Sequence, residues 1–188
     1  MAGIQELFGC TEGSDCKVGL QTHHNTFVVA EDNGEANANG DKLDVREIFS
    51  VNFIGDDSVQ FKGYQEKYLV AETNGTVYAN RDSASAWETW TVEDTHEMGL
   101  AFKSVHGKYL VAESNGQLNA DREVADIWEI FKIVHPDGNK ALLIYNMYYK
   151  LRSYTFLFCI DVPTTPATTP TPEPTEPPES KSSLGFKY

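Results

Sequence analysis

Short runs of hydrophobic residues, separated by polar turns, cover most of the chain, and their spacing is typical of β-strands. Residues 59–61 alternate apolar and polar side chains, as a strand with one buried face does. Residues 68–71 form a continuous apolar run, as expected of a strand buried on both faces, and an Asn-Gly pair follows at Asn74. Because Asn and Gly both tolerate positive φ, this pair predicts a type I′ turn that joins two strands into a hairpin.

The whole pattern occurs three times at an offset of 41 residues, without any gap. The matched blocks are FVVAEDNGEANAN from Phe27, YLVAETNGTVYAN from Tyr68 and YLVAESNGQLNAD from Tyr109, and a fourth segment reads REIFSV, WETWTV or WEIFKI. Such a period indicates one supersecondary unit that buries its apolar face against its copies. Propellers typically need at least four four-stranded blades. Three copies of four strands therefore predict an all-β fold, the β-trefoil, with six strands in a barrel and three hairpins over one end.

The positions that coincide at the 41-residue offset predict the core. They are large and apolar in two sets: Leu20, Phe61 and Phe102, and Phe49, Trp90 and Phe131. We also expect Trp87 and Trp128 to pack as core residues beneath their lobes. Arg46 takes the matching place in the first copy. Because a buried charge needs a partner, Arg46 should reach solvent or meet an acid such as Asp44 or Glu47.

The organisation along the chain follows from the repeats. We predict a lead-in at 1–16, the trefoil at 17–139, and a degenerate or truncated fourth repeat at 140–162 that lacks the VAE and Asn-Gly elements. This last segment is apolar but carries two cations near its middle, so it is not expected to cross a membrane. Residues 163–188 are rich in Pro, Thr and Glu, cannot bury enough apolar surface to offset their ordering entropy, and should form a disordered tail.

Composition and charge restrict the partners. The formal net charge is −13, and the tail from Pro163 carries three Glu and two Lys, so about −12 lies on the rest of the chain. Binding to nucleic acid or to an anionic membrane is therefore disfavoured. The N-terminal MAGIQELFGC has no cationic region before an apolar core, so no secretory signal is expected. Cys10, Cys16 and Cys159 are an odd number without metal-ligand spacing and predict reduced thiols in the cytoplasm.

Residues that could perform chemistry are few. The five histidines fall mostly in predicted turns without a metal-binding pattern, and we expect them to be solvated. Glu47, Glu88 and Glu129 recur in one structural setting, where a buried, hydrogen-bonded carboxylate that anchors a turn is favoured over acid catalysis. No nucleophile with a base, phosphate loop or cofactor motif emerges. The sequence therefore predicts a non-enzymatic module with no catalytic residue, no metal site and no cofactor.

The strings KYLVAE at Lys67 and Lys108, with WETW at Trp87 and WEIF at Trp128, resemble the fascin-like actin-crosslinking domain across all three repeats. The resemblance implies a β-trefoil, filamentous actin as the partner, crosslinking as the activity, and a cytoplasmic, cytoskeleton-associated location. Fascin itself resembles a tandem array of four such trefoils, which lets one molecule contact two filaments. Its first repeat carries a serine- and lysine-rich segment implicated in actin binding. The matching stretch here, 40–46, has an acidic residue in place of the serine and lacks most of the lysines.

Matched cations occur only in the second and third copies. They are Lys62 with Lys103, Lys67 with Lys108, and Arg81 with Arg122, where the first copy has Gln21, Thr26 and Gly40. These six are the candidate actin-binding residues, and the two lysines that flank each turn should lie close together. The alternative is that the cations pair locally with acids such as Glu66, Glu72 and Glu113, each pair stabilising the surface by at most about 1 kcal/mol.

An alternative function is carbohydrate binding. The Gln-x-Trp motif of ricin-type trefoil lectins is absent. The three related hairpin turns, however, are expected to offer three equivalent shallow pockets lined by Asn and aromatic residues. Glycans therefore stand beside filamentous actin as candidate partners.

Overall fold

The computed structural model describes residues 3–11 and 13–137, so the predicted fourth repeat and the predicted tail lie outside the described residues. Twelve strands form three lobes of four. Lobe 1 contains β1 (Lys17–Gln21), β2 (Phe27–Ala30), β3 (Ala36–Gly40) and β4 (Phe49–Ile54); lobe 2 contains β5 (Ser58–Lys62), β6 (Tyr68–Ala71), β7 (Val77–Arg81) and β8 (Thr89–Asp94); lobe 3 contains β9 (Leu100–Ser104), β10 (Tyr109–Ala112), β11 (Leu118–Arg122) and β12 (Ile130–Val134).

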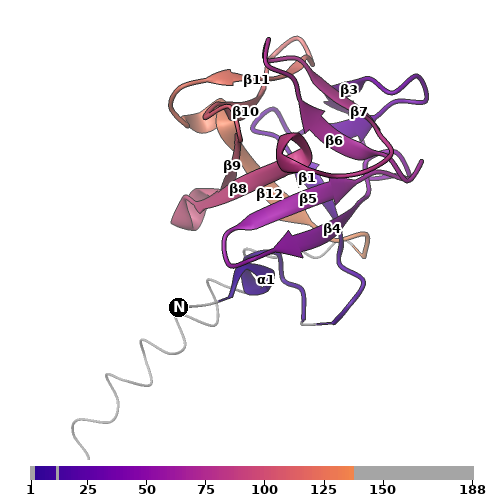
Figure 1. The fold of residues 1–188 in the computed structure, drawn as a ribbon, viewed down its shortest axis with the longest axis vertical. Coiled ribbons are helices and arrows are strands. Elements are labelled where there is room, and N and C mark those ends of the chain that lie inside the picture. Colours follow the sequence, from indigo (N-terminus) through magenta and orange to yellow (C-terminus); the bar gives the residue numbers. More distant parts are fainter. Residues whose placement is uncertain (1–2, 12, 138–188) are drawn as a thin grey trace, which may run out of the picture.

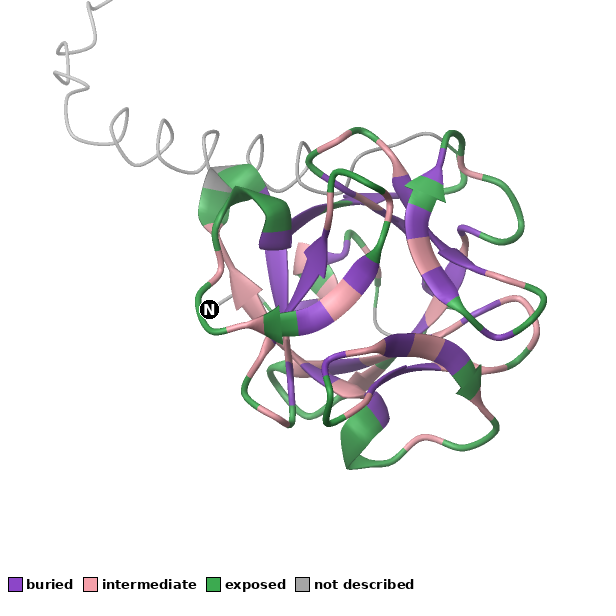
Figure 2. Ribbon diagram, turned by 90° about the horizontal axis from the view of Figure 1, so that it is seen from above, coloured by how far each residue is buried: buried purple, intermediate pink, exposed green. Residues whose placement is uncertain are grey.

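Six of the strands close a barrel. The antiparallel pairs run from β1 to β4, then to β5, β8, β9 and β12, and β12 pairs with β1 again. The remaining strands form the hairpins β2–β3, β6–β7 and β10–β11, which cover the upper end of the barrel in Figure 1 and face the viewer in Figure 2. The fold is the β-trefoil that the sequence predicts.

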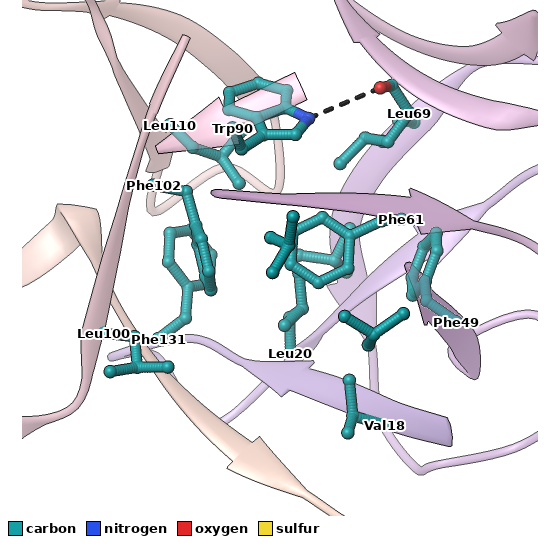
Figure 3. Packing of buried hydrophobic residues seen from close by; sticks show 14 of the residues in the cluster. Val18, Leu20, Phe49, Phe61, Leu69, Trp90, Leu100, Phe102, Leu110 and Phe131 are labelled. Atoms are coloured by element: carbon teal, nitrogen blue, oxygen red, sulfur yellow. Dashed lines mark hydrogen bonds between the residues drawn. The ribbon is translucent and has the colours of Figure 1, made fainter. Parts of the chain in front are cut away.

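The barrel interior is filled by the predicted residues (Figure 3). Leu20, Phe61, Phe102, Phe49, Trp90 and Phe131 all have no exposed surface. The rings of Phe61 and Phe102 meet edge to face with centroids 5.1 Å apart, a favourable aromatic geometry. The indole N–H of Trp90 donates to the carbonyl oxygen of Leu69 at 3.3 Å, so the one polar atom of this side chain is satisfied inside the core.

The lead-in closes the barrel at the end away from the hairpins, which the sequence did not predict. The short helix α1 (Ile4–Leu7) lies there (Figure 1), and it brings the fully buried Phe8 to 5.5 Å from Phe53, centroid to centroid. The histidine ring of His135, through Nε2, bonds the carbonyl oxygen of Phe8 at 2.9 Å. Cys10 and Cys16 form a disulfide, so the prediction of reduced thiols is wrong for these two cysteines.

The Asn-Gly hairpins exist, but their turns are not type I′. Gly34 has φ of 85°, whereas Asn33 is not among the residues with positive φ, and the Gly34 N–H donates to the carbonyl of Glu31. The turn is therefore type I followed by a left-handed glycine. Gly34 also accepts from the Ala79 N–H of the next lobe, and a Cβ on it would meet Asn80 at 2.9 Å. The same bonds join Gly75 to Ala120 and Gly116 to Ala38, so the hairpins interlock around the axis.

The three repeated glutamates anchor turns, as predicted. Glu88 is 3% exposed, and its Oε2 accepts from the backbone N–H and the hydroxyl of Ser85 at 2.8 and 2.9 Å. This bond caps η1 (Ala86–Glu88), a short 3-10 turn that leads into β8. The equivalent bonds run from the Asp44 N–H to Glu47 and from the Asp126 N–H to Glu129, the latter at the start of η3 (Ile127–Glu129).

Candidate functional site

The predicted cations occupy equivalent positions in lobes 2 and 3, and most of them bind carboxylates. Lys67 bonds Asp82, and its counterpart Lys108 bonds Glu123. Arg81 bonds Glu72 and lies 3.8 Å from the buried Glu88; its counterpart Arg122 bonds Glu113 and lies 3.7 Å from Glu129. The proposed local pairing of the arginines is therefore present in both lobes.

The two remaining lysines lie over aromatic rings. Lys62 bonds Glu66 and lies 5.5 Å above the ring centroid of Tyr68. Its hydrogen bond to Glu66 raises the pKa of Lys62, so the amine stays charged at neutral pH. Lys103 lies 4.8 Å above the ring of Tyr109, and in the part of the chain that the structure describes it has no carboxylate within ion-pair distance.

The lysines that flank each turn do not form one bare cationic cluster. Lys62 and Lys67 bond different acids, Glu66 and Asp82, and the side chains of these lysines are only 28% and 35% exposed. At every candidate cation except Lys103, a partner that binds this surface must therefore displace an internal carboxylate. The candidate cations of lobes 2 and 3 are thus mostly paired and do not form an open electropositive patch.

Lobe 1 has a different arrangement. Arg46 is partly exposed and meets acids, as predicted, but these are Glu31 at 3.3 Å and Asp32 at 2.6 Å rather than Asp44 or Glu47. Asp32 also accepts hydrogen bonds from Tyr64 and Gln65 of lobe 2. The bond from Tyr64 is the main cause of a lowered pKa for Asp32, and the same bond raises the pKa of Tyr64.

The prediction that Trp87 and Trp128 belong to the core is wrong. Trp87 is 40% exposed and Trp128 is 37% exposed. Each tryptophan lies in a 3-10 turn, Trp87 in η1 and Trp128 in η3, and the buried residue of each turn is the glutamate that follows the tryptophan. Successive side chains of a 3-10 turn point about 120° apart, so Trp87 faces solvent while Glu88 faces the interior.

Two histidines are fixed against these tryptophans instead of being solvated. The ring of His24 lies 5.2 Å from Trp128, and its Nε2 bonds the carbonyl of Ala112 at 3.2 Å. The ring of His106 lies 5.2 Å from Trp87, and its Nε2 bonds the carbonyl of Ala71 at 3.0 Å. The expectation of solvated histidines is wrong for both of them and for His135, which bonds Phe8, whereas His23 and His96 are exposed as expected.

The repeats contain a signal for these contacts that sequence reasoning missed. At the 41-residue offset, His24, Gln65 and His106 coincide, and so do Arg46, Trp87 and Trp128. His24 contacts Trp128, and His106 contacts Trp87. Gln65 instead bonds Asp32, the acid that is paired with Arg46. In each case the second residue belongs to the preceding lobe around the barrel. Histidine stands opposite tryptophan at two lobe junctions, and glutamine stands opposite arginine at the third.

Two surface depressions accompany these features. One, of about 250 Å³, lies between lobes 1 and 3 and is lined by Thr22, His23, Met98, Ile127, Ile130 and Lys132. The other, of about 220 Å³, lies among the three hairpins and is lined partly by Asn37, Tyr78 and Asn119. Within 3–11 and 13–137, no cluster of His, Cys, Asp or Glu is arranged to hold a metal, and no helix is long and apolar enough to cross a membrane.

Comparison with known families agrees with the geometry. The family model described as the Fascin domain matches residues 23–133, which run from the first turn of lobe 1 into the last strand of lobe 3. No curated protein matches the chain.

Proposed function

This chain belongs to the Fascin domain family, a family of non-enzymatic binding folds, and from that membership we propose that it binds filamentous actin. The candidate contact residues are the lobe-2 and lobe-3 cations, listed here in matched order: Lys62, Lys67 and Arg81, and Lys103, Lys108 and Arg122. Their repeated placement carries the proposal, since the same trio stands at equivalent points of two lobes on a chain of net charge −13.

The ion pairs of these cations determine how strong such binding is. An exposed pair stabilises a protein by at most about 1 kcal/mol, so acidic groups on a filament can displace Asp82 from Lys67 at little cost. The overall negative charge repels an acidic filament at long range, and attraction exceeds repulsion only within a Debye length of roughly 8 Å at physiological salt. We expect weak binding that depends on salt.

Charge reversal at the matched lysines tests the proposal. Lys62→Glu with Lys103→Glu should abolish pelleting with filamentous actin, because each change inserts an acid into the contact surface. Lys17→Glu with Lys132→Glu is the matched control, since it changes the net charge equally at exposed lysines outside the proposed surface. Loss of pelleting in both double variants would indicate an effect of net charge alone. Unchanged pelleting of the first would contradict the proposed contact residues.

Crosslinking and location are finer parts of the same proposal. Pelleting at low centrifugal speed measures bundling, and pelleting only at high speed measures binding without bundling.

The cellular location has two opposing indications. The family favours the cytoplasm, whereas the Cys10–Cys16 disulfide favours an oxidising compartment. Mass spectrometry after thiol alkylation of the protein isolated from its own cells measures which state the two cysteines occupy.

Carbohydrate binding is the second candidate function. Asn33, Asn74 and Asn115 each accept a hydrogen bond, through Oδ1, from the backbone N–H two residues ahead in their own turn. One lone pair of each oxygen is therefore committed to the turn. The observation that favours a glycan ligand is the exposure of Trp87 and Trp128.

A further inference from the structure

Two of the three lobe junctions display a tryptophan beside a histidine. Trp128 of lobe 3 meets His24 of lobe 1 at an interplanar angle of 66°, and Trp87 of lobe 2 meets His106 of lobe 3 at 73°. Both pairs have centroids 5.2 Å apart, and both indoles keep more than a third of their surface exposed. We call these pairs the two aromatic junctions.

The hydrogen bonds of each histidine determine what it presents to solvent. Nε2 of His24 lies 3.2 Å from a carbonyl oxygen, which can only accept, so Nε2 carries the proton. In this tautomer of the neutral imidazole, Nδ1 is an acceptor, and the same holds for His106. Among the described contacts, neither Nδ1 atom nor the indole N–H of Trp87 or Trp128 has a hydrogen-bond partner, whereas Trp90 donates to Leu69.

Each aromatic junction therefore combines a rigid apolar ring with one free donor and one free acceptor. A sugar ring is complementary to this set, because it has one face of C–H groups and a rim of hydroxyls that both donate and accept. An apolar peptide would leave the free donor and acceptor unpaired, which costs free energy. We propose that the Trp128–His24 and Trp87–His106 junctions each bind one ring of a neutral saccharide.

Charge and compartment favour this ligand class. The net charge of −13 disfavours sulfated, phosphorylated or sialylated glycans. The Cys10–Cys16 disulfide is of the kind that persists in oxidising environments, where glycans are displayed. Next to Trp128 and His24, their chain neighbours Ile127 and His23 line the depression of about 250 Å³, which gives a longer saccharide room beyond the first ring.

The third junction lacks these features and serves as an internal control. Arg46 and Gln65 replace the tryptophan and the histidine, and both are held by Asp32. Neither Arg46 nor Gln65 offers an aromatic ring on which a sugar could stack. The inference does not depend on actin binding, since it uses none of the six candidate cations.

Nuclear magnetic resonance of the indole N–H groups tests the inference on the full chain, which has three tryptophans. The probes are cellohexaose, laminarihexaose, chitohexaose and mannohexaose. Each is added up to about 10 mM, so that binding with a Kd of about 1 mM would be detected. At least one probe should shift the signals of Trp87 and Trp128 and leave that of Trp90 in place.

Variants decide whether the shifts report these sites. The double variant Trp87→Ala with Trp128→Ala should raise the Kd of the saccharide that shifts the indole signals at least 10-fold, as measured by calorimetry. Arg46→Ala should leave this Kd unchanged. The Trp90 signal reports in each variant that the barrel is still folded. If none of the four probes shifts an indole signal, or if the double variant binds as well as the native chain, the inference is overturned. Actin pelleting by the same double variant should be normal, which separates this outcome from that of the actin proposal.

Discussion

The barrel interior and the lobe junctions obey the same 41-residue repeat but differ in how far their residues diverge. Inside the barrel, the three equivalent positions hold Phe49, Trp90 and Phe131, all fully buried. At the junctions, the equivalent positions hold Arg46, Trp87 and Trp128, all partly exposed. Close packing restricts the first set to large apolar side chains, whereas the second set can change from aromatic to charged and still find partners. The fold is thus held by the repeated interior, and the binding properties vary at the junctions.

The largest effect that tests this contrast comes from two tryptophans three residues apart. Trp90→Ala should lower the free energy of unfolding by about 3–5 kcal/mol, because it removes a buried aromatic ring. Trp87→Ala should lower it by less than about 1.5 kcal/mol, because much of that ring is already in water. Urea unfolding of both variants measures the difference. Equal losses would show that interior and junction contribute alike.

An exchange of junctions should have a smaller effect on stability. Arg46→Trp with Gln65→His turns the polar junction into a copy of the other two, and the exposed ion pairs that it removes contribute at most about 1 kcal/mol each. The free energy of unfolding should therefore change by no more than about 1–2 kcal/mol, and a fourth indole signal should appear. Arg46→Trp alone is the control, since it lacks the histidine. A much larger loss would mean that the junctions are not interchangeable.

The smallest effect concerns pH at the polar junction. The folded pKa of Asp32 lies below its ordinary value of 3.8, mainly because Tyr64 donates to its carboxylate. Its contribution to stability is therefore present above pH 3.8 and is lost as the pH falls through the folded pKa. Tyr64→Phe should return the pKa of Asp32 toward 3.8 further than Arg46→Ala does. A carbon NMR titration of the carboxyl group measures both shifts, and the reverse order would contradict the assigned cause.

Periodicity was sufficient to predict the fold, the two repeated sets of large residues inside the barrel, and the turn-anchoring glutamates. Three gapless copies constrain the topology, and identity at Glu47, Glu88 and Glu129 indicates one shared role. The same comparison failed for the turn type, because an Asn-Gly pair suits both a type I′ turn and a type I turn with a left-handed glycine at its end. Only the backbone angles separate the two.

Contacts that depend on residues outside the repeat, or on different lobes, could not be read from one copy. Phe8 and the Cys10–Cys16 disulfide lie before the first repeat, so no periodic signal marks them. Trp87 was assigned to the core, but Glu88 takes the buried position of the 3-10 turn η1 that both residues share. The histidine contacts join neighbouring lobes and become visible only when the three copies are compared position by position.

The ion pairs of the candidate cations were likewise only partly predictable from the sequence. Their matched positions were evident from the repeats, and local pairing with Glu66, Glu72 and Glu113 was the stated alternative, without an assignment of each acid to its cation. The structure pairs these acids with Lys62, Arg81 and Arg122. The partners of Lys67 and Lys108 were not foreseen. Asp82 and Glu123 lie 15 residues further along the chain, across a strand pair that only the folded hairpin brings together.

Co-sedimentation of the native chain with filamentous actin across a salt series tests the proposed function most directly. We predict pelleting at about 0.05 M salt that declines steeply by about 0.5 M, because screening shortens the range over which the paired cations of lobes 2 and 3 attract the filament. Absence of pelleting at the lowest salt, or pelleting that does not change with salt, would contradict an electrostatic actin contact at these residues.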